Sequence, residues 1–101
     1  MKIQEFQEKI RHTYFERDSH RGVDKNFLWF TEEVGELAEA IRKRDKKGLE
    51  EEMADVLAWL ATLANLLDVN LESAAISKYG EGCSRCDQSP CSCPEDFTRN
   101  N

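Results

Sequence analysis

Two pairs of acidic residues lie inside apolar stretches that have the helical period. Glu33 and Glu36 form the first pair, and Glu52 and Asp55 form the second, with a spacing of three residues in each. Residues three apart share one face of a helix. Large apolar side chains fall on the same faces, namely Trp29, Phe30 and Leu37 for the first pair and Val56, Trp59 and Leu63 for the second. Because burial of uncompensated carboxylates is costly, the pattern predicts a hard divalent cation between the pairs.

The two segments that carry these acids are joined by a short connection, so we expect them to pack as antiparallel helices with both pairs facing one gap. A ligand set of carboxylate oxygens, without histidine or cysteine, favours Mg²⁺ or Mn²⁺ over Zn²⁺ and copper. The alternative interpretation is a set of surface acids neutralised by lysines, or helix caps. That alternative does not account for the tryptophan and leucine beside both pairs.

The composition restricts the classes of partner. The chain has 101 residues and a formal net charge of −6, with no basic run that would neutralise a phosphate backbone, so we expect no nucleic-acid polymer as a partner. No apolar stretch is long enough for a membrane helix, and the N-terminus lacks the apolar region of a signal peptide. Since all four cysteines lie within residues 83–93, we expect a cytoplasmic protein without a disulfide framework.

The apolar period predicts an all-α fold, with helices at about 2–16, 24–44, 49–67 and 71–79. Residues 17–23 are polar and aperiodic, which indicates a loop, and Asp24 is the expected cap of the second helix. The segment 49–67 is apolar almost all round, and a chain of this length offers too few neighbours to cover it. We therefore expect a four-helix bundle over residues 1–80, completed by homo-oligomerisation as a dimer or tetramer, and a cysteine-rich tail over 81–101.

The acidic segments resemble the MazG-like nucleotide pyrophosphohydrolases. The run from Phe30 to Ala40 is similar to the EExxE segment of that family, and Glu52–Val56 is similar to its ExxD segment. The resemblance extends over residues 3–79 and implies a MazG-like helical fold. It also implies that Glu33, Glu36, Glu52 and Asp55 hold Mg²⁺, in agreement with the argument from helical faces.

The resemblance implies hydrolysis of a nucleoside triphosphate between the α- and β-phosphates, giving a nucleoside monophosphate and pyrophosphate, in a role that cleans the nucleotide pool. Metal ions neutralise phosphate oxygens and orient water in such reactions. Glu32 and Glu33 are the candidates for orienting and deprotonating that water. The rival hypothesis is a non-catalytic, oligomeric interaction module whose metal sites are structural.

Candidates for binding the substrate lie outside the acidic segments. Lys78 and Trp59 match a lysine and a base-stacking aromatic of the family, while Arg17, Lys25, Asn26 and Trp29 lie around the start of the second predicted helix. The alternative for the basic residues is a solvated surface charge, and for the tryptophans a place in the core. The chain departs from the family after Lys78, where Tyr79–Cys83 stands in place of an asparagine and a run of arginines.

The tail offers four thiols within eleven residues, at Cys83, Cys86, Cys91 and Cys93. This number is enough for one tetrahedral Zn²⁺ site, and a metal would supply the order that a tail with few apolar residues cannot obtain from burial. We therefore predict structural Zn²⁺. The alternatives are free thiols in an unstructured tail, disulfides, or an iron–sulfur cluster, for which the predicted enzyme offers no redox role.

Overall fold

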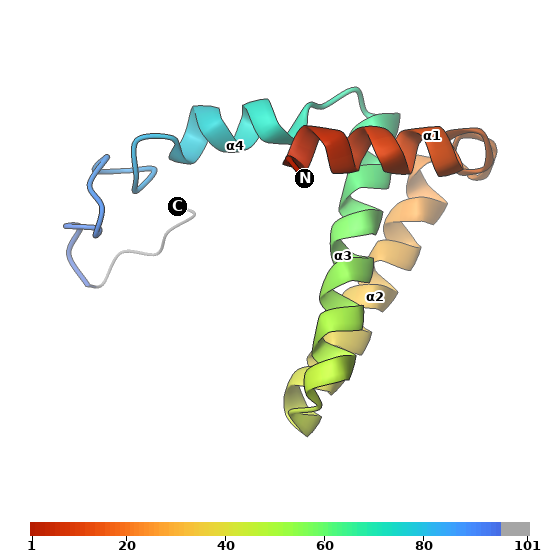
Figure 1. The fold of residues 1–101 in the computed structure, drawn as a ribbon, viewed down its shortest axis with the longest axis horizontal. Coiled ribbons are helices and arrows are strands. Elements are labelled where there is room, and N and C mark those ends of the chain that lie inside the picture. The colour runs from red at the N-terminus through yellow and green to blue at the C-terminus, as the bar shows by residue number, and fades with distance from the viewer. Residues whose placement is uncertain (96–101) are drawn as a thin grey trace. The chain divides into compact units, whose positions relative to one another are not determined.

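The computed structural model describes residues 1–95, which contain four α-helices and no strand (Figure 1). The helices are α1 (Ile3–Arg21), α2 (Val23–Lys43), α3 (Lys46–Leu66) and α4 (Leu71–Tyr79). The all-α prediction is thus confirmed. The chain forms two compact units, Met1–Leu71 and the part from Glu72 onward. The predicted division into domains at residue 80 stays a prediction, and the part of the predicted tail after residue 95 lies outside the described residues.

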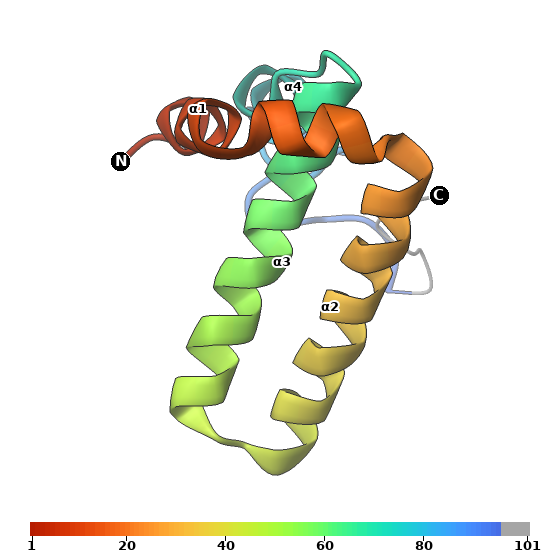
Figure 2. The ribbon, with the colours of Figure 1, turned by 90° about the vertical axis from the view of Figure 1, so that its right-hand side faces the viewer.

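The first unit is a helical hairpin with a third helix across one end. Helices α2 and α3 run side by side in opposite directions, and α1 lies across the end where α2 begins and α3 finishes (Figures 1 and 2). The hairpin turn follows Lys43, where Arg44 adopts a left-handed conformation (φ 57°) and its N–H bonds to the carbonyls of Ala40 and Ile41. The antiparallel packing of the two acid-bearing helices is as predicted.

The predicted loop over residues 17–23 is wrong. Helix α1 continues to Arg21, and Gly22 alone, at φ 92°, makes the turn into α2. The polar segment stays helical because it has buried partners: Asp18 is only 5% exposed and accepts a hydrogen bond of 2.9 Å from the hydroxyl of Thr62 on α3. Asp24 does not cap α2, whose cap residue is Gly22. Helix α3 begins at Lys46, three residues before its predicted start at 49.

A polar network joins α1 to the end of α3. The side-chain amide of Gln7 donates to Asn65 Oδ1 (3.1 Å) and to the carbonyl of Val69 (2.7 Å), and its oxygen accepts from the N–H of Leu71 (2.9 Å). Asn65 in turn donates to the carbonyl of Gln7 (3.2 Å). These bonds satisfy buried polar groups on both helices and so set the position of α1 against the hairpin.

The apolar core of this unit is small. The buried apolar residues among those described are Ile10, Ala40, Ala61, Leu63 and Ala64. Large apolar side chains remain exposed along both arms of the hairpin, namely Phe27, Leu28, Val34 and Ile41 on α2 and Met53, Leu57 and Leu60 on α3. A soluble monomer rarely leaves so many apolar side chains uncovered along one pair of helices.

The described part of the second unit contains α4 after its first residue and a series of turns that carries the four cysteines. Helix α4 has the predicted bounds and ends where the N–H of Gly80 bonds to the carbonyl of Ile76 (2.8 Å). Within residues 1–95, no single helix has both the length and the apolarity needed to cross a membrane, and α3 and α4 reach those values only when counted together as a bent pair.

Candidate functional site

Three carboxylates from two helices meet in the gap of the hairpin. Glu33 and Glu36 come from α2 and Glu52 from α3, and each offers an oxygen within 4.8 Å of the other two. One oxygen of Glu33 and one of Glu52 are buried without a hydrogen-bond partner. Carboxylate oxygens without donors are costly unless a cation satisfies them, so this set of residues fits a hard divalent metal ion. We call these three residues the carboxylate cluster.

The electrostatics of the carboxylate cluster also favour the binding of a cation. Burial, followed by the charges of Glu36 and Asp55, raises the pKa of Glu33 from 4.5 to about 7. The pKa of Glu52 is raised by burial and then by the same two neighbours. Like charges that share one site oppose ionisation of each other, and a bound cation removes this opposition.

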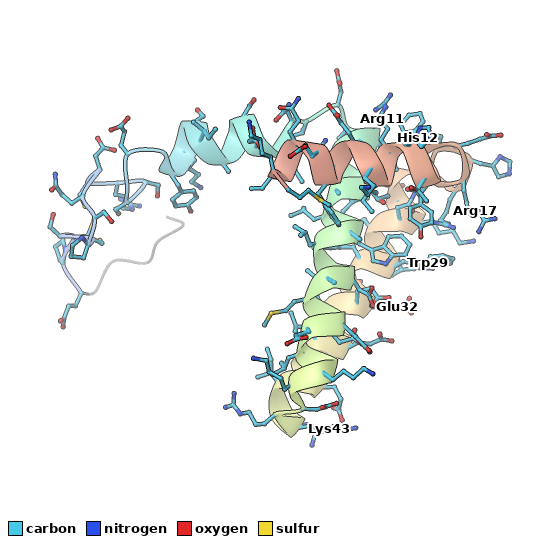
Figure 3. All side chains as sticks on the ribbon, viewed as in Figure 1. Arg11, His12, Arg17, Trp29, Glu32 and Lys43 are labelled. Atoms are coloured by element: carbon cyan, nitrogen blue, oxygen red, sulfur yellow. The ribbon has the colours of Figure 1, made fainter. Side chains whose placement is uncertain are left out.

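The fourth predicted ligand, Asp55, lies one turn after Glu52 on α3 and raises the pKa of both Glu33 and Glu52 by its charge. It is outside the set of three oxygens that converge, and it lines a neighbouring cavity instead. Glu32 is exposed on α2 and is also outside the cluster (Figure 3). Its predicted role in orienting water stays a prediction.

A cavity of about 230 Å³ opens beside the cluster, between α1 and the hairpin. Its lining is Ile10, Tyr14, Arg17, Asp18, Arg21, Trp29, Asp55, Ala58, Trp59 and Thr62. The rings of Trp29 and Trp59 meet edge to face across the hairpin, with centroids 5.7 Å apart. Arg17 of α1 and Trp29 of α2 project on the same side of the molecule (Figure 3). The cavity therefore combines aromatic surface with basic side chains. Its wall also includes Asp55, which the sequence predicts as a metal ligand.

Arg21 lies over the aromatic surface of this cavity. Its guanidinium carbon is 4.3 Å from the Trp29 ring centroid and 5.7 Å from that of Trp59, which is the geometry of a cation–π contact. It also donates to Asp18 Oδ1 (3.2 Å) and Asn26 Oδ1 (2.9 Å). Both Arg21 and Asp18 lie in the segment predicted as a loop, for which no contact between them is expected, whereas α1 places them on one face. Their three-residue spacing was the available signal, since it is the spacing of neighbours on a helix.

Asn26, a predicted substrate residue, is fully buried at the corner between α1 and α2. Its amide donates to the carbonyls of Asp18 (2.9 Å) and Gly22 (2.7 Å), while its oxygen accepts from Arg21. These bonds occupy the side chain, which is absent from the cavity lining. Asn26 therefore positions Arg21 and closes the corner after Gly22.

A second hollow, of about 270 Å³, lies on the other side of the cluster toward the hairpin turn. It is lined by Glu36, Glu39, Ala40, Lys43, Asp45, Gly48 and Glu52. Lys43 supplies the positive charge of this lining, and its ammonium is 3.6 Å from Glu39 Oε1. The carboxylate cluster thus has the aromatic cavity on one side and this acidic hollow on the other.

The remaining predicted residues are outside both linings. Lys25 is exposed on α2, with its ammonium 5.9 Å from the Trp29 ring centroid, and Lys78 is on α4, with its ammonium 5.6 Å from the Tyr79 ring centroid. The four cysteines of the tail converge so that their sulfur atoms all lie within 4.8 Å of one another. Hydrogen bonds from Ser92 lower the pKa of Cys86 to about 6, whereas burial raises the pKa of Cys93 to about 12.

Comparison with known proteins agrees with this geometry. The family model of the MazG nucleotide pyrophosphohydrolase domain matches residues 21–85, which include α2, α3 and α4. The chain is also 46% identical over 54 residues to the uncharacterized protein YpjD of Bacillus subtilis (strain 168). That match covers 44% of this chain and 49% of YpjD, so the chain spans about half the length of this relative. Because the family model covers more than half of the residues, this chain belongs to the MazG nucleotide pyrophosphohydrolase domain family.

Proposed function

We propose that the protein is a Mg²⁺- or Mn²⁺-dependent nucleoside triphosphate pyrophosphohydrolase that gives a nucleoside monophosphate and pyrophosphate. The observation that carries the proposal is the carboxylate cluster, with its two buried oxygens that lack hydrogen-bond partners, beside a cavity walled by two tryptophans. Family membership supports the reaction class. A role in clearing unwanted nucleotides from the cytoplasm follows as part of the same proposal.

Glu33, Glu36 and Glu52 would hold the metal, and Asp55 would complete the acidic set from one turn further along α3. A bound divalent ion supplies neutralisation of phosphate oxygens and polarises the bond that breaks. The buried oxygens of Glu33 and Glu52 need such a charge, because protein donors do not satisfy them. Glu32 or Glu33 would orient the attacking water and accept its proton.

The aromatic cavity suits the nucleoside. Trp29, Trp59 and Tyr14 supply aromatic surface, and a base gains about 1–3 kcal/mol by stacking on such a side chain. Arg17 and Arg21 supply hydrogen-bond donors and positive charge in the same wall. Lys25, near the Trp29 ring, is a further candidate for contact with the substrate.

The order of residues along the hairpin gives the substrate a direction. From the α1 end of the hairpin toward its turn, α2 presents Trp29, Glu33, Glu36 and Lys43 in that order. Helix α3 runs the opposite way, and in the same direction it presents Trp59, Asp55, Glu52 and Gly48. A base beside the tryptophans would place its proximal phosphates at the acids. The distal phosphates would then extend into the second hollow, toward Lys43. We include Lys43 as a phosphate-binding residue, and contact of Lys78 with the phosphates stays a prediction from the family resemblance.

The exposed apolar side chains of the hairpin support a homo-oligomer. Leu57 and Leu60 on α3 are 44% and 40% exposed, and Met53 one turn before Leu57 is 54% exposed. A second copy of the chain offers matching apolar faces, and association would remove this surface from water. We propose a dimer or tetramer built on these faces of α2 and α3.

The test is pyrophosphate release from a panel of ribo- and deoxynucleoside triphosphates, with Mg²⁺ and with EDTA. We expect metal-dependent formation of monophosphate and pyrophosphate, and its loss in Glu36→Gln. The matched control is Glu50→Gln, which removes one charge from an exposed position outside both linings. Absence of release by folded, metal-loaded protein would overturn the proposal in favour of a non-catalytic interaction module.

A further inference from the structure

The described part of the segment after α4, residues 80–95, forms turns without an apolar core. Residues 80–95 contain no aliphatic side chain larger than proline, no methionine and no aromatic residue. Even so, the backbone folds back on itself: the N–H of Cys83 bonds to the carbonyl of Gln88 (3.0 Å), and the N–H of Asp87 bonds to the carbonyl of Cys83 (2.8 Å). Some interaction other than hydrophobic burial must hold these turns together.

The four cysteine sulfur atoms lie at the centre of these turns. Cys83 Sγ is 3.8 Å from Cys93 Sγ, and Cys86 Sγ is 4.0 Å from Cys91 Sγ. A disulfide needs a separation of about 2.05 Å, so neither pair is bonded. Four sulfur ligands at about 2.3 Å from a tetrahedral Zn²⁺ ion would be about 3.8 Å from one another. These two separations are close to that value, and all four sulfur atoms lie within 4.8 Å of one another, so the cluster fits a tetrahedral metal site.

The backbone around the sulfur atoms also suits bound thiolates. The N–H groups of Arg85, Ser92 and Cys93 point at the sulfur atoms of Cys83, Cys86 and Cys91, at 3.5, 3.4 and 3.3 Å. Such donors stabilise the negative charge of thiolate ligands and orient them. Asp87, directly after Cys86, adopts the left-handed conformation (φ 62°) in the turn that its N–H closes with the carbonyl of Cys83.

We infer that Cys83, Cys86, Cys91 and Cys93 form a structural Zn²⁺ site that folds the segment after α4, separately from the carboxylate cluster. Four sulfur ligands in a tetrahedron leave no open position for substrate, which is typical of structural zinc. The ligand atoms also make the two sites selective for different metals. Zn²⁺ binds well to the sulfur atoms, whereas Mg²⁺ prefers the oxygens of the carboxylate cluster. The site lies within the second compact unit, so removal of its metal should unfold the turns and leave the helical unit intact.

The experiment measures metal content in the full chain, purified without chelator from zinc-supplemented cells. We expect one zinc per chain, retained in Glu36→Gln and in the control Ser89→Ala and lost in Cys86→Ser. The Cys91→His variant should keep zinc, because histidine can replace one sulfur ligand, whereas Cys91→Ser should lose it. Replacement by Co²⁺ should give the intense absorption of tetrahedral thiolate coordination.

A second readout separates metal-dependent folding from incidental binding. After zinc removal by a strong chelator, limited proteolysis should cut within residues 80–95 much faster, while helical circular dichroism stays nearly unchanged. Zinc-free protein whose cysteines are disulfide-bonded would overturn the inference, as would iron in place of zinc or equal proteolysis with and without metal. These readouts do not depend on hydrolysis, so they remain valid even if the proposed activity fails.

Discussion

The indole rings of Trp29 and Trp59 meet edge to face, with centroids 5.7 Å apart and planes inclined by 75°. Each tryptophan has an acid of the site one helical turn away toward the hairpin turn. These acids are Glu33, four residues after Trp29 on α2, and Asp55, four residues before Trp59 on α3. The contact therefore joins the two arms of the hairpin next to the carboxylate cluster and at the same time forms part of the cavity wall. Recognition of a base and placement of a phosphate would share one set of helix positions.

Replacement of Trp59 by alanine should weaken nucleoside binding. Loss of a stacked aromatic costs about 1–3 kcal/mol, so the Kd for the product monophosphate should rise roughly 5- to 150-fold. Calorimetry with the purified variant measures this value. Trp59→Phe keeps an aromatic face and should bind far better than the alanine variant. Equal binding by wild type and Trp59→Ala would show that the nucleoside does not stack on Trp59 in this cavity.

Replacement of Lys43 by alanine should act on the distal phosphates alone. A contact with an exposed ammonium contributes about 1 kcal/mol, so KM for the triphosphate should rise roughly fivefold. Binding of the monophosphate should be unchanged, because the proposed arrangement places its phosphate at the acids of the cluster. Lys46→Ala makes the same change of charge at an exposed position outside the hollow and serves as the control. An equal rise in KM for Lys43→Ala and Lys46→Ala would show that the overall charge of the chain, and not a contact with Lys43, determines binding of the triphosphate.

Metal-free protein should lose stability as the pH rises through neutrality. Folded Glu33 has a pKa of about 7, against 4.5 for the ordinary carboxyl group, so the folded chain holds more protons than the unfolded chain between these values. Stability then falls between about pH 4.5 and pH 7 and stays lower above that range. Urea denaturation in EDTA at pH 5, 6, 7 and 8 tests this expectation.

Two comparisons assign that pH dependence to Glu33. Glu33→Gln should make the profile in EDTA shallower, because the amide does not titrate, and should leave the contribution of Glu52, whose pKa is also raised. Saturating Mg²⁺ should stabilise the wild type at pH 8 by about 2.7 kcal/mol at one hundred times Kd, and it should stabilise Glu33→Gln much less. A variant with the wild-type profile would place the titrating group elsewhere.

Asn26→Ala should destabilise the fold by about 2 kcal/mol. The side chain is fully buried and makes three hydrogen bonds, so its loss leaves the carbonyl of Asp18 and the guanidinium of Arg21 short of partners. Lys25→Ala, at the exposed neighbouring position, should change stability by less than about 0.5 kcal/mol. Thermal and urea unfolding measure both. Similar values for the two variants would contradict a structural role for Asn26.

Leu57→Glu should weaken the proposed oligomer. The side chain is 44% exposed on α3, so the charge is tolerated in a monomer but is costly in an interface between copies. Light scattering after size-exclusion chromatography should give a lower mass than for the wild type. Lys47→Glu changes charge at an exposed position near the hairpin turn and should leave the mass unchanged. A wild type that is monomeric at all concentrations would refute the oligomer itself.

The sequence by itself determined that the chain folds into four helices and that three of its predicted acidic ligands lie together. The bounds of α4 and the end of α2 at Lys43 agree with prediction, because apolar period and helix-ending residues are local signals. The spacing of Glu33, Glu36 and Glu52 was enough to bring them onto facing sides of two antiparallel helices, since three residues make nearly one turn.

Tertiary structure alone decided how the polar residues around the cavity are used. Residues 17–21 lack an apolar period, yet they are helical because Thr62 and Asn26, distant in sequence or across the corner, bond to Asp18. The same contacts bury Asn26, which the sequence predicts as a substrate residue. They also hold Arg21 over the ring of Trp29. Local periodicity carries no information about such partners, because a polar side chain is buried only where another part of the chain satisfies its hydrogen bonds.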